Sequence, residues 1–103
     1  MTNTNVIREI AADLIDEQIA ADANFAMKFS MGMYAYDCNA YELISRAFMG
    51  KIKCLTRDEM IDHLISRHST YDAITDHAEL YIQTCVEGYA LLRKDADAMP
   101  IFA

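Results

Sequence analysis

Residues 70–94 read TYDAITDHAELYIQTCVEGYALLRK, and this stretch decides the fold. Apolar and small side chains recur in it at steps of three and four residues, as on one face of an α-helix. We expect the following side chains to form the buried seam of a long helix: Ile74, Ala78, Tyr81, Cys85, Gly88 and Leu92. The chain has one proline, Pro100, and three glycines. A sheet protein would need many more of these turn-forming residues. The sequence therefore predicts an all-α protein.

Two further helices are predicted on the N-terminal side of this stretch. Residues 4–19 place their apolar side chains on one stripe and their charged side chains opposite, so Thr4 can cap an amphipathic helix. Residues 22–24 then interrupt the pattern, and residues 25–41 carry apolar rows on two sides, which is typical of a buried central helix. Gly32 lies within that segment and costs roughly 1 kcal/mol relative to alanine. We infer that a neighbouring backbone or ring packs closely against it.

Later helix starts are predicted from a capping side chain followed three residues on by a carboxylate. The pairs are Asn39 with Glu42, Thr56 with Glu59, and Ser69 with Asp72. They predict boundaries near residues 40, 57 and 70, a short helix over 40–49 that ends at Gly50, and a linker over 51–56. The helix from 57 should bury Met60, Ile61, Leu64 and Ile65. We expect one domain, residues 1–103, built as a compact bundle of four to five helices with a frayed tail at 95–103.

The apolar content indicates a second copy of the chain. Hydrophobic residues make up 53% of the 103 residues, more than a core of this size readily hides. We therefore expect a homodimer whose contact involves Phe25, Phe29, Met33 and Tyr36. The three cysteines form no paired motif, which favours reduced thiols. Neither a secretion signal nor an apolar run of bilayer-spanning length is apparent, so we expect a cytoplasmic protein without membrane contact.

No motif in the chain predicts catalysis. The candidate metal ligands are Glu59, His63, Asp72, Asp76 and His77, but neither an HExxH motif nor a repeated ExxH pair is present. No serine or cysteine nucleophile stands at a recognisable spacing from a histidine. The scattered glycines form no phosphate-binding loop. We expect no catalytic residue, no metal, no cofactor and no enzymatic activity.

Charged residues are ordered along the sequence, and the formal net charge is -7. Carboxylates recur about every turn on the first predicted helix, at Glu9, Asp13, Asp16 and Glu17. Such a row is a crude imitation of a phosphate backbone and predicts an acidic partner-binding face. A basic linker offers an alternative partner-binding surface: Arg46, Lys51, Lys53 and Arg57. Because the isoelectric point is about 4.7, direct binding of nucleic acid is disfavoured.

The segment from residue 60 to residue 81 resembles the lambda-type Gam proteins. The similarity rests on MIDHLISRH at 60–68, IT at 74–75 and AELY at 78–81. Gam proteins are small, acidic, helical phage inhibitors that block the DNA-binding channel of a host exonuclease by imitating DNA. The resemblance covers about 25 of the 103 residues and no part of the first helix. It implies inhibition of a host nuclease, without assigning the residues that make contact.

These observations predict a small acidic helical protein that acts through protein–protein contact. The specific hypothesis is a phage or mobile-element inhibitor of a host nucleic-acid-handling complex, either a nuclease or a CRISPR-type effector. A helical regulatory or adaptor subunit of a cellular complex is the alternative. A small metal-binding or enzymatic helical bundle is the third class.

Overall fold

Four α-helices make up the part of the chain that the computed structural model describes, residues 4–34 and 54–98. They are α1 (Thr4–Ala21), α2 (Phe25–Tyr34), α4 (Arg57–Arg67) and α5 (Tyr71–Ala98). These two ranges contain no strand, so the all-α prediction is confirmed. The predicted helix over 40–49 and its Asn39 cap lie outside the described residues. Within the same ranges, no helix combines the length and apolarity needed to cross a bilayer.

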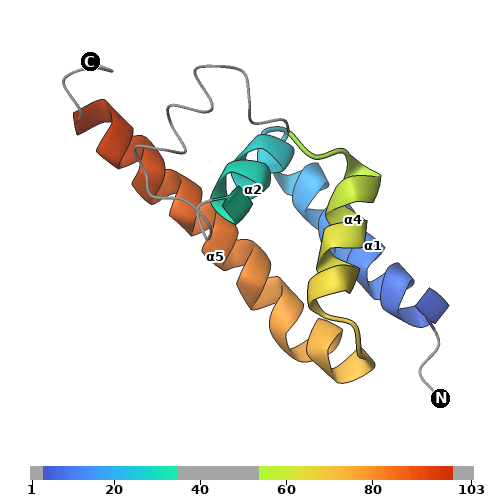
Figure 1. Ribbon diagram of the computed structural model, residues 1–103. Helices are drawn as coiled ribbons and strands as arrows, with labels where there is room; N and C mark the ends of the chain where they lie inside the picture. The colour runs from blue at the N-terminus through green and yellow to red at the C-terminus, as the bar shows by residue number, and fades with distance from the viewer. Residues whose placement is uncertain (1–3, 35–53, 99–103) are drawn as a thin grey trace.

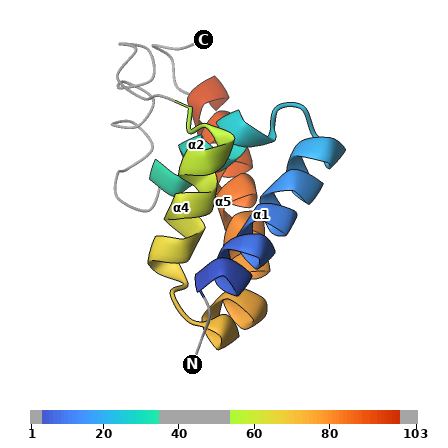
Figure 2. The same ribbon diagram turned by 90° about the vertical axis from the view of Figure 1, so that its right-hand side faces the viewer.

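Helix α5 is the longest of the four, and the others pack along one side of it (Figures 1 and 2). Its predicted seam is buried at Ile74, Ala78, Tyr81 and Cys85, with Ile82 beside it. The two flanking helices contribute rows spaced as predicted, Ile7, Ala11 and Ile15 from α1, and Met60, Ile61 and Leu64 from α4. Ile65 is only partly buried.

Gly32 brings α2 directly onto the backbone of α5. A Cβ atom at Gly32 would stand 1.8 Å from the Cys85 carbonyl oxygen and 2.8 Å from the Cys85 Cα. Only a residue without a side chain permits this approach. The predicted close packing at Gly32 is therefore confirmed, and the neighbour is backbone. Gly88 differs, because a Cβ there would meet nothing within 4 Å.

The core of the same chain takes up two of the residues expected to form a dimer contact. Phe25 and Phe29 are 2% and 0% exposed, and their ring centroids lie 5.5 Å apart. Phe29 also packs edge-on against Tyr81, with 6.1 Å between centroids. Neither phenylalanine is on the surface, so the assignment of both to an interface was wrong. Apolar rows on both sides of α2 reflect burial within one chain. Met33 is partly buried against the core, and Tyr36 lies outside the described residues.

Local signals at the helix ends account for most of the boundaries. Thr56 caps α4 through the predicted reciprocal bonds: its side chain accepts from the Glu59 amide, and the Glu59 carboxylate accepts from the Thr56 amide. The cap of α5 is Thr70, whose hydroxyl accepts from the Ala73 amide at 3.1 Å; the prediction of Ser69 was one residue early. Helix α5 continues four residues past Lys94 to Ala98, close to Pro100, which cannot continue a helix.

His68 lies buried at the turn between α4 and α5. The residue is 7% exposed, and its Nδ1 atom lies 3.2 Å from the Leu64 carbonyl oxygen. That geometry requires a proton on Nδ1. Burial lowers the pKa of His68 from its ordinary value, the bond to Leu64 opposes this shift, and the nearby positive charge of Arg67 adds to it.

The two glycines provide a matched test of the packing. Gly32→Ala should lower the free energy of unfolding by at least about 2 kcal/mol, because α2 and α5 must separate. Gly88→Ala should raise it by up to about 1 kcal/mol, because alanine is the better helix former and finds open space. Urea denaturation measures both. Equal effects of the two substitutions would contradict the close approach at Gly32.

His68 should make stability depend on pH. Since its pKa is lower in the folded chain, the unfolded chain binds the extra proton first, and stability falls as pH drops through about 6.5. His68→Asn, which retains an amide donor toward Leu64, should flatten this part of the profile. Urea denaturation between about pH 7.5 and pH 5 measures the contribution of His68 to stability. The carboxyls of Asp16 and Asp22 have lowered pKa values, so their protonation reduces stability only at lower pH. An identical slope in the variant would contradict this role.

Candidate partner-binding surface

The outward face of α1 carries a row of exposed carboxylates. Glu9, Asp13 and Glu17 recur every four residues, so they stand above one another on the side of the helix opposite Ile7, Ala11 and Ile15. Successive carboxylates are about 6 Å apart along the axis. The described part of the structure contains no ion pair to any of the three.

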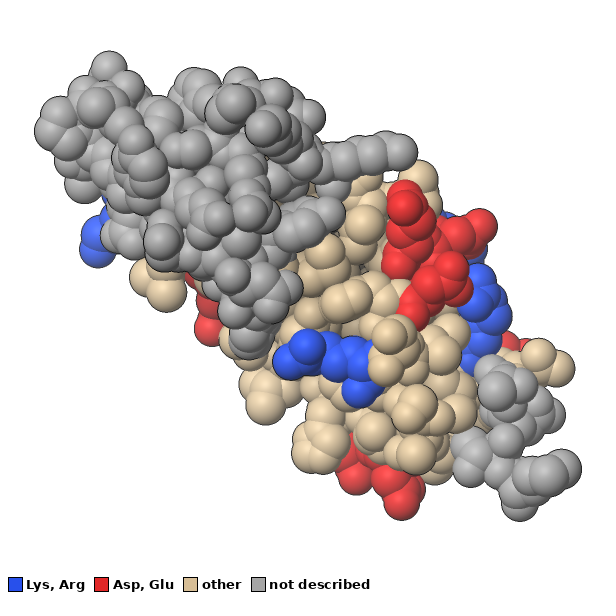
Figure 3. All heavy atoms as spheres, viewed as in Figure 1, with Lys and Arg blue, Asp and Glu red and all other residues tan. Residues whose placement is uncertain are grey.

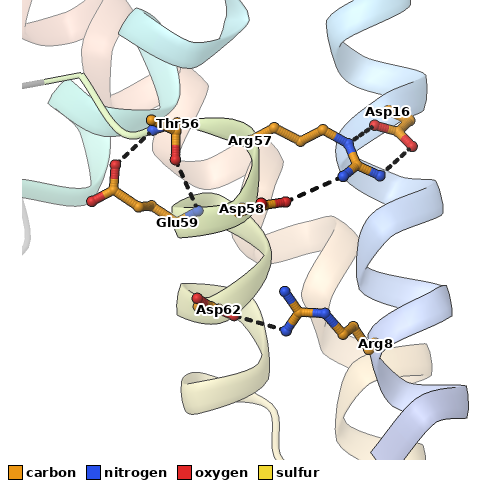
Figure 4. A network of polar contacts seen from close by, with 7 residues as sticks. All are labelled: Arg8, Asp16, Thr56, Arg57, Asp58, Glu59 and Asp62. Carbon is orange, nitrogen blue, oxygen red and sulfur yellow. Dashed lines mark hydrogen bonds and ion pairs between the residues drawn. The ribbon is translucent and has the colours of Figure 1, made fainter.

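Asp16, the fourth member of the predicted acidic face, differs from this row because it binds Arg57 of α4. It accepts two hydrogen bonds from Arg57, at 2.6 Å from Nε and 2.9 Å from Nη2 (Figure 4). These hydrogen bonds lower the pKa of the Asp16 carboxyl, and the same pair raises the pKa of Arg57. The predicted face is therefore divided into a free row of three carboxylates and one carboxylate that joins two helices.

A second ion pair, between Arg8 and Asp62, also joins α1 to α4. Arg8 Nη1 lies 2.8 Å from Asp62 Oδ1, and Arg57 Nη1 also reaches Asp58 Oδ1 at 3.3 Å (Figure 4). All these side chains are solvent-exposed, and exposed pairs contribute little stability. Their effect is to decide which charges remain free. Both arginines are already engaged with carboxylates of the chain itself.

Arg57 is the only member of the predicted basic linker among the described residues. It is the first residue of α4, directly after the capping residue Thr56, and the capping box holds the turn from which it reaches Asp16. Arg46, Lys51 and Lys53 lie outside the described residues. From the sequence, the acidic face and the basic linker were alternative partner-binding surfaces. In the structure one residue of each, Asp16 and Arg57, form an ion pair.

Helix α4 also carries exposed carboxylates. Asp58, Glu59 and Asp62 are exposed, and Figure 3 shows acidic side chains gathered over the N-terminal half of α4 with basic side chains beside them. Asp58 and Asp62 have the arginine partners described above, and Glu59 closes the capping box. The exposed surface of α4 is thus acidic overall, and Arg8 and Arg57 lie between α1 and α4.

The residues considered as metal ligands have other positions and partners. His63 Nε2 lies 2.6 Å from the Tyr81 hydroxyl, and the Arg67 guanidinium lies 4.4 Å from the centroid of the Tyr81 ring. Asp72, Asp76 and His77 are exposed on α5. Across residues 4–34 and 54–98, no three histidine, cysteine or acidic side chains are grouped closely enough to hold a metal ion. That the protein binds no metal stays a prediction.

Comparison with protein-family models, with curated proteins and with solved structures gives no match for this chain. The resemblance to Gam proteins therefore stays an expectation. The segment that carries it forms α4 and the first turns of α5, where Ile61 and Leu64 are core residues and Asp62 and His63 make contacts within the chain.

The pairing of Asp16 with Arg57 can be tested by titration. In the parent protein the Asp16 carboxyl should titrate below its ordinary range, and Arg57→Gln should return its pKa toward that range. Carbon-detected NMR of the side-chain carboxyl across about pH 2 to 6 measures the change. Arg8→Gln is the matched control, since Arg8 pairs with Asp62 instead. An Asp16 titration unaffected by Arg57→Gln would show that the two are not paired in solution.

Proposed function

We propose that this chain is a phage or mobile-element inhibitor of a host nucleic-acid-handling complex, a nuclease or a CRISPR-type effector. It acts in the host cytoplasm by protein–protein contact and carries out no catalysis. The observation that carries the proposal is the row of Glu9, Asp13 and Glu17, exposed on α1 and without an ion pair in the described part of the chain.

Such a row resembles nucleic acid in sign and in linear arrangement. Charges about 6 Å apart are sparser than the phosphates of one DNA strand, which are about 3.4 Å apart. The exposed carboxylates of α4, a helix that is paired with α1 through Arg57, add to the negative field. A protein channel that is lined with lysine and arginine to hold DNA would attract this surface over a distance of about one Debye length.

The division of charge within the chain also favours a basic partner. Arg8 and Arg57 are held between α1 and α4 by carboxylates of the chain, so they do not neutralise the outward row. The net charge of -7 repels nucleic acid itself. The Gam resemblance supports the same class of target, since Gam proteins occupy a DNA channel.

The acidic row is tested by charge reversal. Asp13→Lys combined with Glu17→Lys should weaken inhibition at least about tenfold, because attraction to a basic channel becomes repulsion. The assay follows degradation of a labelled linear duplex by an extract of bacterial cells, and cleavage by purified CRISPR effectors, with increasing amounts of the protein. Inhibition by the parent should also weaken as salt rises.

Asp72→Lys combined with Glu79→Lys is the matched control. It makes the same change in net charge at two exposed positions of α5, away from the row, and should retain inhibition within about threefold. Circular dichroism should show the same helical signal for all three proteins, because exposed substitutions usually change stability by under about 0.5 kcal/mol. No inhibition by the parent in any assay, or equal inhibition by the Asp13 and Glu17 variant, would contradict the proposal.

A further inference from the structure

The outward face of α5 exposes two leucines on a helix whose other side fills the core. Leu80 and Leu91 are each 65% exposed, the largest values among the exposed large hydrophobic residues described. They are eleven residues apart, which is three helical turns or about 16 Å, and so they lie on one stripe. Isolated exposed leucines are ordinary, but two that are aligned on one exposed helix face form an apolar stripe.

Opposite charges stand at the two ends of this stripe. Asp76 is one turn before Leu80, and Lys94 is one turn after Leu91, and both side chains are exposed. Neither has an ion pair in the part of the chain that the structure describes. Glu87 and Thr84 lie between the leucines on the same face. The order along the helix is therefore acidic, apolar, polar, apolar and basic.

We propose that this face binds the same face of a second copy, with the two α5 helices antiparallel about a twofold axis. In this register Leu80 lies level with Leu91 of the second copy, and Asp76 lies within one residue of the level of Lys94 of the second copy. Each contact occurs twice, as a twofold interface requires. Like the flanking charges of coiled coils, the two ion pairs set the direction of the partner helix.

The charges exclude the parallel arrangement. Parallel helices with Leu80 against Leu80 would bring Asp76 against Asp76, Glu87 against Glu87 and Lys94 against Lys94. Like charges at such positions oppose association. The antiparallel register replaces the first and last of these repulsions with attractions. It places Glu87 level with Thr84 of the second copy, which separates the two Glu87 carboxylates along the axis by about 4.5 Å.

The proposed dimer surface on α5 differs from the one expected from the sequence, which included Phe25 and Phe29. Both phenylalanines are core residues. The surface on α5 is also independent of the acidic row. Helix α1 packs on the inner side of α5, so a dimer formed through the outer side leaves Glu9, Asp13 and Glu17 of both copies exposed. With two apolar anchors per copy, we expect dissociation constants in the micromolar range.

Sedimentation equilibrium of the full chain at about 1 to 200 µM and low salt tests the proposal. The parent should show a concentration-dependent equilibrium between 11.7 kDa and twice that mass. Asp76→Lys and Lys94→Asp should each weaken association about tenfold, since each turns two attractions into repulsions. The double variant, Asp76→Lys with Lys94→Asp, exchanges the charges and should restore association to within about threefold of the parent.

Further variants separate this interface from the other surface. Leu80→Gln with Leu91→Gln should abolish association, and Glu87→Gln should strengthen it by removing a repulsion near the axis. Asp13→Lys, on α1, makes the same charge change as Asp76→Lys on α5. It should leave association of the two copies unchanged and weaken inhibition of the target. A chain that stays monomeric at 200 µM would overturn the proposal. Failure of the charge-exchanged variant to restore association would also overturn it.

Discussion

The contact between Gly32 and the Cys85 backbone is the constraint on which the rest of the packing depends. A missing side chain on α2 lets two helix backbones meet, and the approach places Phe29 against Tyr81. Tyr81 in turn contacts His63 and Arg67 of α4, so one aromatic ring links three helices. Ser30, next to this contact, donates to the Ala26 carbonyl and accepts from the Leu55 amide, which fixes the start of the segment that enters α4.

Packing of α1 and α4 on the core determines which charges face outward. Asp16 and Arg8 project from α1 toward α4, where Arg57 and Asp62 meet them, while Glu9, Asp13 and Glu17 project away. Helix spacing alone does not separate these two groups, because Asp16 follows Asp13 by three residues and lies on a neighbouring side of α1. The hydrogen bonds from Arg57 of α4 distinguish Asp16 from the row. The proposed function and the proposed dimer use different outward faces, one on α1 and one on α5. A dimer built on α5 would present two acidic rows to a target.

Features carried by local spacing were predicted well from the sequence. The seam of α5, the stripe of α1 and the Thr56 capping box depend on neighbours within one or two turns. Gly32 was noticed because glycine is unfavourable inside a helix, but the backbone that requires it, at Cys85, belongs to a distant part of the chain. Long-range partners were not predictable in this way. Asp16 and Arg57 are 41 residues apart, and Ser30 and Leu55 are 25 apart, so no spacing rule joins them. Phe25 and Phe29 were assigned to a dimer because periodicity shows that a side is apolar, but not which neighbour covers it. At α5, Ser69 and Thr70 are adjacent capping residues, and the carboxylate at Asp72 favoured the wrong one.

The central claim is that the protein occupies the surface on which its target holds DNA. The most direct measurement asks whether a target nuclease can bind both at once, using fluorescence anisotropy of a labelled duplex on the nuclease together with sedimentation of the mixture. The account predicts competition: the labelled duplex is released as the protein is added, the apparent dissociation constant of the DNA rises in proportion to protein concentration, and no ternary complex sediments. A stable complex that contains nuclease, duplex and this protein together would contradict it.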